Sequence, residues 1–247
     1  MVNQFLVYDR IDSTNAEAQR QLAQGREPPF VVIAREQDAG RGRRGRSWAS
    51  PRGNYFATHV VAVDAGSPPI QQVSLVTGLS VHRTIVDLGV DPARVEIKWP
   101  NDVLIDEKKV AGILLETQSG TDDQKTLCIG IGINLVAKPT GALRREPITL
   151  KDLVAPSVNL NVEGIAQQLS DTLHREITQW REEGFSALKP SLIERLHGIG
   201  RPFLLEVEKG RTERAVLTDI DDAGQALFCD SDGKRITHIA GDIQEIP

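Results

Sequence analysis

A short segment rich in arginine and glycine carries the residues best suited to chemistry in this sequence. In residues 40–46, arginines alternate with glycines, and Trp48 follows closely. The planar guanidinium group suits phosphate because its fork of N–H donors matches two oxygens, and glycine lets the backbone approach a ligand. This composition favours a mobile anion-binding loop with an aromatic ring for stacking, although a solvated basic loop or a nucleic-acid patch can have the same residues.

The same segment matches the Gly-x-Gly-x-x-Gly fingerprint of dinucleotide-binding proteins. That fingerprint requires a crossover helix between two parallel strands, and such a crossover needs about a dozen residues or more. Only residues 46–53 separate Gly45 from the strand expected at 54–63, which is too short a segment for such a crossover. The sequence therefore argues against a Rossmann-type site here.

Three further motifs place polar or small residues at the ends or in the middle of expected strands. Residues 98–102 read Lys-Trp-Pro-Asn-Asp, and the proline ends a strand so that the last two residues lie at its exit, where binding groups are common. Residues 109–116 set a lysine before a buried strand, and residues 130–134 read Gly-Ile-Gly-Ile-Asn. A glycine inside a strand often marks the close approach of a ligand or of backbone. Taken singly, none of these motifs is specific, and residues 98–102 alone are more typical of an ordinary turn.

The elements that must position these motifs follow from the hydrophobic pattern. Helices are expected where apolar residues recur with helical spacing, and strands where short apolar runs are bounded by turn residues. Asn161 predicts one helix start, and the Thr14-x-x-Glu17 spacing predicts another as a capping box. The pattern predicts helices at 14–22, 70–89 and 161–184, and strands at 30–34, 54–63, 95–99, 103–105, 110–115 and 127–133.

The overall composition is that of an ordinary globular protein. The chain has 247 residues, a formal net charge of -5 and 40% hydrophobic residues, which suits one large domain with or without a small second one. It lacks an apolar run of the roughly 20 residues that span a bilayer, and its first residues lack the pattern of a secretory signal. Its 2 cysteines are too few for a disulfide framework. We therefore expect a reduced, cytoplasmic protein without membrane partners.

The C-terminal part differs in character from the rest of the chain. From Arg201 onward, short apolar runs are separated by turn signals at 209–210, 221–224 and 230–233, as in small all-β domains. We therefore predict one domain at 1–198 and a small β-barrel at 199–247. Aspartate and glutamate outnumber lysine and arginine in this barrel, which argues against a surface for nucleic acid.

Taken in this order, the motifs resemble those of biotin protein ligases. The resemblance rests on residues 12–15, 40–48, 98–102, 109–116 and 130–134. It implies an α+β fold, with a mixed-sheet catalytic domain similar to class II aminoacyl-tRNA synthetases and an SH3-like C-terminal barrel. It also implies an enzyme that forms biotinyl-5′-AMP from biotin and MgATP. The enzyme would then transfer biotin to a lysine of a biotin carboxyl carrier domain and release AMP.

The resemblance also implies roles for individual residues. Catalytic roles fall to Lys109, Arg43 and Asp102, of which Lys109 would bridge the biotin carboxylate and the phosphate, while Asp102 would orient the incoming lysine. Biotin would be bound by Ser13, Thr14, Asn15, Gln37, Gly40, Arg41, Gly42, Arg43, Lys109, Gly112 and Ile113. ATP would be bound by Arg43, Arg46, Trp48, Lys98, Asn101, Lys109 and Asn134. Mg²⁺ would be held mainly by the ATP phosphates, and no metal ligands are assigned.

Two alternatives remain open at this point. A related ligase for lipoate or another carboxylic acid would share the fold and the adenylation chemistry, although the arginine loop and the Lys-Trp-Pro-Asn-Asp motif favour biotin. A nucleic-acid-binding module could use the basic loop, against which the net charge of -5 argues. Some members of the resembled family add an N-terminal DNA-binding domain, and the early position of residues 13–15 predicts that this chain has none and is no repressor. Many relatives form homodimers, but the sequence displays no dimer interface.

Overall fold

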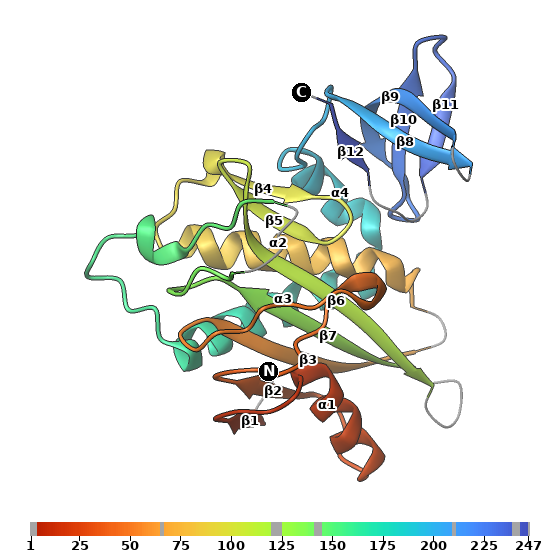
Figure 1. Cartoon of the computed structure of the whole chain (residues 1–247). Coiled ribbons are helices and arrows are strands. Elements are labelled where there is room, and N and C mark those ends of the chain that lie inside the picture. The colour runs from red at the N-terminus through yellow and green to blue at the C-terminus, as the bar shows by residue number, and fades with distance from the viewer. Residues whose placement is uncertain are drawn as a thin grey trace.

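A mixed seven-stranded sheet forms the centre of the molecule (Figure 1). The computed structural model describes residues 4–64, 67–119, 125–140, 145–208, 211–238 and 243–246. The strand order is β1-β2-β3-β7-β6-β5-β4, in which β1 and β2 are parallel and every other pair is antiparallel. The strands are β1 (Phe5–Tyr8), β2 (Phe30–Ala34), β3 (Tyr55–Val63), β4 (Val95–Lys98), β5 (Asp102–Ile105), β6 (Lys108–Ser119) and β7 (Lys125–Ile133).

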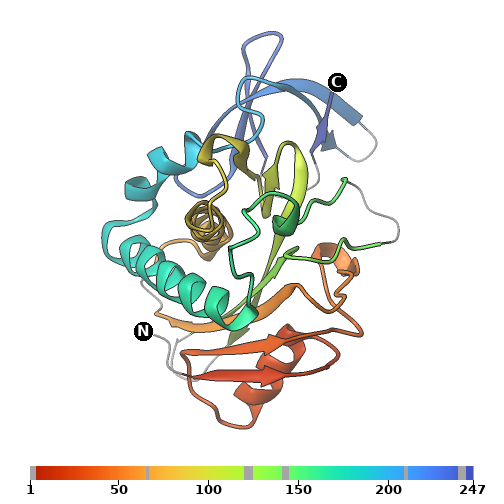
Figure 2. The same ribbon diagram turned by 90° about the vertical axis from the view of Figure 1, so that its left-hand side faces the viewer.

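Helices cover both faces of this sheet (Figure 2). Alternate residues of a strand point to opposite faces, so Val31 and Ile33 of β2 join the main core, whereas Phe30 and Val32 pack with Ala18 on the other side. The helices are α1 (Thr14–Ala23), α2 (Val73–Asp87), α3 (Val162–Glu183) and α4 (Phe185–Ile193), with 3-10 turns η1 (Arg43–Gly45), η2 (Ile70–Gln72), η3 (Pro92–Arg94) and η4 (Leu150–Asp152). In the part of the chain that the structure describes, no helix is long and apolar enough to span a membrane.

The predicted elements are confirmed, with one correction at the start of α1. Asn161 caps α3 by accepting a hydrogen bond from the Gly164 backbone N–H at 2.6 Å. In α1, by contrast, the N-cap is Ser13 and makes no side-chain cap. The expected capping box of Thr14 and Glu17 is therefore wrong, because the Glu17 carboxylate accepts hydrogen bonds from Tyr8 and other side chains instead.

The C-terminal strands form a second, antiparallel sheet in the order β11-β10-β9-β8-β12. Among the described residues no pairing joins β11 to β12, so the expected barrel is not closed. Gly224 and Gly233 have positive φ in the turns that the sequence predicted there, while the turn expected at 209–210 lies outside the described residues. The strands are β8 (Pro202–Glu208), β9 (Arg211–Ile220), β10 (Ala226–Asp230), β11 (Arg235–His238) and β12 (Gln244–Glu245).

The two sheets share one hydrophobic core and several polar contacts. Phe203 and Phe228 belong to the same buried cluster as the strands of the central sheet. Trp99, which follows β4, donates its indole N–H to the carbonyl of Gly224 at 3.0 Å. The C-terminal sheet is therefore held close to the Lys-Trp-Pro-Asn-Asp motif. The predicted boundary between 198 and 199 falls in the connection from α4 to β8 and remains our proposal for the domain division.

Candidate active site

A pocket of about 650 Å³ opens between the arginine–glycine loop, strands β4 to β7 and the C-terminal sheet. Gln244 and Glu245 of β12 belong to its wall, so both sheets contribute to it. Most of the residues that the sequence predicted for a site come together here: Ser13, Thr14, Asn15, Gln37, Arg41, Gly42, Arg43, Arg46, Trp48, Lys98, Asn101, Asp102, Lys109, Gly112 and Ile113. Gly40 and Asn134 are not part of the lining.

One end of the pocket is built from neutral polar side chains, of which Ser13, Thr14 and Asn15 are buried and Gln37 is half-buried. Thr58 donates to Asn15 Oδ1 at 2.5 Å, and Asn15 Nδ2 donates to Glu116 at 2.9 Å, so the amide orientation is fixed. The Thr14 backbone N–H donates to Gln37 Oε1 at 2.8 Å. Since each amide retains hydrogen-bonding capacity, this end can recognise a neutral ligand that both donates and accepts hydrogen bonds.

The arginine–glycine loop is folded back on itself beside the pocket. The Gly42 N–H donates to the Arg46 carbonyl at 2.7 Å, and the Trp48 N–H donates to the Gly40 carbonyl at 2.8 Å. A methyl group on Gly40 would lie 2.4 Å from the Trp48 carbonyl oxygen. Gly40 is thus required for the close packing of the loop, and its contact with biotin stays a prediction.

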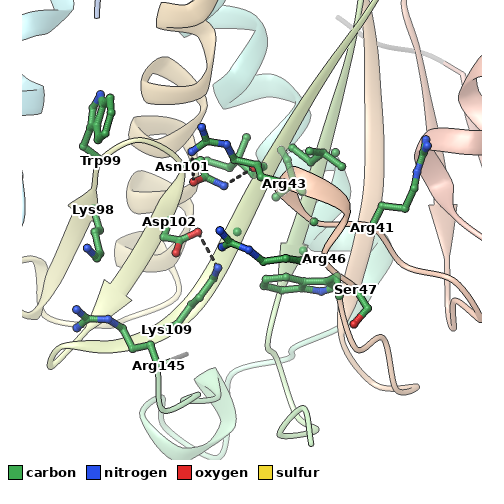
Figure 3. Close-up of a pocket in the computed structure, with 18 of the residues that line it drawn as sticks. Arg41, Arg43, Arg46, Ser47, Lys98, Trp99, Asn101, Asp102, Lys109 and Arg145 are labelled. Atoms are coloured by element: carbon green, nitrogen blue, oxygen red, sulfur yellow. Dashed lines mark hydrogen bonds and ion pairs between the residues drawn. The ribbon is translucent and has the colours of Figure 1, made fainter. Parts of the chain in front are cut away.

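Two arginines of the loop reach residues of the sheet. Arg41 forms an ion pair with Glu116 of β6 at 2.8 Å, and Arg43 donates to Asn101 Oδ1 at 3.1 Å. Figure 3 shows the side chain of Arg46 over the same pocket. The loop therefore faces the strand ends with several guanidinium groups, an arrangement that suits an anionic ligand.

Trp48 lies against the glycines of β6 and β7. A methyl group on Gly112 would come within 2.7 Å of its ring, and one on Gly132 within 2.6 Å of Nε1. The ammonium of Lys109 is 5.0 Å from the ring centre. Among the described residues, the buried Nε1 of Trp48 has no hydrogen-bond partner. The strand glycines, for which the sequence also allowed simple packing, thus make room for an aromatic wall of the pocket.

The centre of the pocket holds a lysine–carboxylate pair. Lys109 Nζ lies 2.7 Å from Asp102 Oδ1, and both side chains are about one-quarter exposed. Asn101 Nδ2 donates to the Ile113 carbonyl at 2.8 Å, which fixes the corner between β4 and β5 (Figure 3). The positions of these groups make Lys109 the central cation and Asp102 the carboxylate beside it.

Asn134 supports this centre from below rather than lining the pocket. Its side chain is buried and Nδ2 donates to the backbone carbonyl of Lys109 at 3.2 Å. Its backbone N–H donates to the Val110 carbonyl at 2.9 Å. Asn134 thus helps to fix the start of β6, and its predicted contact with ATP stays a prediction.

The far end of the pocket carries a second group of charges. Lys98 Nζ lies 3.0 Å from Glu245 Oε1, and Arg145 pairs with the same oxygen. Beneath them, the imidazole of His197 lies 2.9 Å from Glu96 and 3.3 Å from Glu245, and its side chain is fully buried. Burial lowers the pKa of His197, but the two carboxylates outweigh burial and raise it above its ordinary value.

Some of the residues that make these contacts were not predicted from the sequence. Glu116, Arg145, His197 and Glu245 were not predicted, although Glu116 lies inside a motif that was recognised. The only available signal was the position of Glu116 on the strand that begins with Lys109, since β6 carries both toward the pocket. The other three come from segments with no motif of their own.

The described residues offer no metal-binding cluster. They contain no group of three or more His, Cys, Asp or Glu that could hold a metal ion. The carboxylates of the pocket are instead paired with cations, as Asp102 is with Lys109 and Glu245 with Lys98.

Comparisons with known proteins show which family this chain resembles in sequence. The model of the biotin/lipoate A/B protein ligase family matches residues 7–134. A biotin--[acetyl-CoA-carboxylase] ligase of Paracoccus denitrificans is 33% identical over 236 residues, covering 92% of this chain and 95% of the relative. One of Mycobacterium tuberculosis is 34% identical, covering 94% and 85%.

A solved structure is also similar in fold. The biotin protein ligase from Aquifex aeolicus in complex with biotin and ATP has a TM-score of 0.81 and 23% sequence identity, and the match covers 98% of each chain. Together with the family model and the two sequence relatives, this likeness leads to one conclusion. The chain belongs to the biotin/lipoate A/B protein ligase family.

Proposed function

We propose that this chain is a biotin–protein ligase that uses ATP to attach biotin to a specific lysine of a biotin carboxyl carrier domain, through biotinyl-5′-AMP. The observation that carries the proposal is the order of groups along the pocket. A neutral polar end at Asn15 is followed by the central cation Lys109 and then by the cationic end at Lys98. This order suits a ureido ring, a carboxylate at the α-phosphate and a leaving pyrophosphate.

In the first step, a carboxylate oxygen of biotin attacks the α-phosphorus of ATP. The bond from the α-phosphorus to the bridging oxygen breaks, and pyrophosphate leaves. Negative groups converge in this transition state, so cations fixed beforehand lower its free energy. Lys109 and Arg43 serve this purpose, because the ion pair with Asp102 and the hydrogen bond to Asn101 hold them at the strand ends.

In the second step, the uncharged amine of the acceptor lysine attacks the acyl carbon of the mixed anhydride. AMP leaves with the oxygen that linked it to the acyl group, and the new amide nitrogen loses a proton. Asp102 orients the incoming amine with the carboxylate oxygen that Lys109 does not engage. No covalent intermediate on the protein is needed, which suits a pocket whose reactive groups are cations and carboxylates.

The loop at residues 40–48 protects the intermediate in this proposal. Its position beside the pocket and its ion pair to Glu116 support a closed arrangement over biotinyl-5′-AMP. Exclusion of water prevents hydrolysis of a reactive anhydride. Mg²⁺ enters as MgATP, bound through the phosphates. We retain a cytoplasmic location and a homodimer as further hypotheses, the second to be tested by measuring the mass of the protein in solution.

The decisive experiment is biotin-dependent exchange between ATP and labelled pyrophosphate, followed by transfer of biotin to a purified carrier domain. We expect exchange only when biotin is present, and a single modified lysine on the carrier. Absence of exchange at saturating biotin would exclude biotin adenylation. Exchange with lipoate but not with biotin would assign the chain to the other branch of the family.

A further inference from the structure

The end of the pocket opposite the arginine–glycine loop gathers two cations that come from distant parts of the chain. Lys98 ends β4, and Arg145 belongs to the segment that follows β7. Figure 3 shows both beyond Lys109, on the side away from Arg41 and Arg46. Of these two cations, only Lys98 was given a role by the family resemblance. The function of Arg145 in the pocket lining therefore still needs an explanation.

Both cations converge on one carboxylate oxygen of the C-terminal sheet. Glu245 Oε1 accepts from Lys98 at 3.0 Å and from the guanidinium of Arg145. The three side chains are between 15% and 26% exposed, so they lie mostly within the protein. His197 approaches the same oxygen from beneath at 3.3 Å. Hydrogen bonds from His197, Arg145 and Lys98 hold the pKa of the Glu245 carboxyl well below its usual range, so it remains ionised.

We propose that Arg145 is a second phosphate-binding cation, which acts with Lys98 on the β- and γ-phosphates of ATP, and that Glu245 is the positioning residue for both. This inference rests on the proposed function. It adds one binding residue from the segment after β7 and one positioning residue from β12. The C-terminal sheet thereby acts on the nucleotide through the two cations.

The hydrogen-bonding capacity of the cations supports the phosphate contact. An ammonium has three donors and a guanidinium has five. Glu245 Oε1 receives both cations at a single oxygen, and Arg145 also donates from Nη1 to the Glu107 carbonyl. The remaining N–H groups of each cation can face the pocket. With Lys109 at the centre and the loop arginines opposite, cations then flank the whole length of a bound triphosphate.

The length of the two side chains explains why a positioning carboxylate is useful. Free lysine and arginine side chains lose much of their rotamer entropy when they are fixed. Glu245 fixes both before the nucleotide arrives, so less of this cost falls on binding. A bare carboxylate at this point would repel phosphate, but the Glu245 carboxylate is engaged by Lys98, Arg145 and His197.

The first test compares Arg145→Ala and Arg145→Lys with wild type in the exchange reaction. We expect the KM for ATP to rise about tenfold or more in R145A, as for the loss of a hydrogen bond to a charged group. R145K should recover part of this loss because it restores the charge. The KM for biotin should stay within about twofold of wild type, since the biotin subsite lies at the other end of the pocket.

The matched control is Arg201→Ala. Arg201 forms an ion pair with Glu107 at 2.6 Å between the start of the C-terminal sheet and the β5–β6 turn, and it does not line the pocket. R201A therefore removes an arginine–glutamate ion pair that lies outside the pocket proposed for the nucleotide. Equal changes in the KM for ATP in R145A and R201A would overturn the inference, as would an unchanged KM in R145A.

The second test examines the positioning residue. Glu245→Gln should raise the KM for ATP in the same direction as R145A, and Glu245→Asp should recover part of the effect by restoring the charge. A lower KM for ATP in E245Q would mean that the carboxylate competes with phosphate, and would overturn the positioning role. If wild type catalyses no exchange, the proposed function fails separately. Calorimetric binding of MgATP to the full chain and to R145A then still decides whether Arg145 binds phosphate.

Discussion

At the scale of single residues, the position of a charged side chain decides whether it can act at the centre of the pocket. Lys108 and Lys109 are neighbours of the same type, yet only Lys109 lines the pocket and pairs with Asp102. Lys108 pairs instead with the exposed Glu146. Exposed ion pairs contribute little to stability, so the difference between the two lysines is expected in catalysis and not in folding.

Lys109→Ala should therefore slow adenylate formation by roughly 10- to 150-fold, the effect of losing a hydrogen bond to a charged group. Lys108→Ala is the matched control and should remain near wild type. The measurement is the rate of biotin-dependent pyrophosphate exchange at saturating substrates, with thermal unfolding to verify the fold of both variants. Equal rates in the two variants would remove Lys109 from the catalytic centre.

The residues of the site differ in how well sequence alone could find them. Lys98, Asn101 and Lys109 lie in contiguous motifs, and their strands carry them to one pocket as the resemblance implies. Arg145 and Glu245 have no such signal, because their role depends on tertiary contacts between segments far apart in the chain. Single charged residues in loops and edge strands look the same whether they are solvated or functional.

At the scale of elements, β7 contributes to the site through the absence of side chains. A methyl group on Gly130 would lie 2.4 Å from Asn15 Oδ1, and one on Gly132 would lie 2.6 Å from Trp48 Nε1. The two glycines lie two residues apart, so they share one face of the strand. One thus makes room at the neutral polar end, and the other makes room for the aromatic wall.

Alanine at these two positions should therefore separate the two substrates. Gly130→Ala displaces Asn15 and should raise chiefly the KM for biotin, whereas Gly132→Ala displaces Trp48 and should raise chiefly the KM for ATP. Because both substitutions are chemically identical and lie on one strand, each serves as the control of the other. Steady-state exchange kinetics with each substrate varied in turn would reveal a reversed or uniform pattern, which would contradict this division.

Some helices and strands could be predicted from the local sequence pattern, and others could not. Strands such as β2 and β7 were predictable because continuous apolar runs flanked by turn residues identify buried strands. The four-residue β1 was missed, since its short run gives no clear periodicity and its pairing with β2 is not local. The capping box failed because tertiary partners bind the side chains it would have used: the Thr14 hydroxyl is hydrogen-bonded to the Thr58 hydroxyl, and Tyr8 donates to Glu17.

At the scale of the whole molecule, a buried histidine lies where the two sheets meet. His197 is enclosed by carboxylates of both, and its pKa is raised above the ordinary 6.5 because these carboxylates outweigh burial. A histidine with a raised pKa stabilises the folded state fully below the unfolded pKa, and this contribution is lost as pH rises through the folded pKa. The charged groups around it are Glu96, Glu107, Glu245, Lys98 and Arg145.

Replacement of His197 by glutamine should therefore change the pH dependence of stability. The advantage of wild type over H197Q in the free energy of unfolding should be greatest below about pH 6.5 and should decline as pH rises above that value. Chemical unfolding of both proteins across this range measures the difference directly. A difference that stays constant, or that grows with pH, would contradict a protonated His197 between the carboxylates.

The placement of Trp48 also gives the protein an optical property. Of its 3 tryptophans, Trp99 and Trp180 are almost fully buried, whereas Trp48 is half-buried against the strand glycines beside the Lys109 ammonium. Emission from Trp48 should therefore shift in wavelength or intensity when the pocket fills, and Trp48→Phe should abolish most of that change. Stopped-flow fluorescence of the unlabelled protein could then time the arrival of each substrate without a dye or a radioactive label.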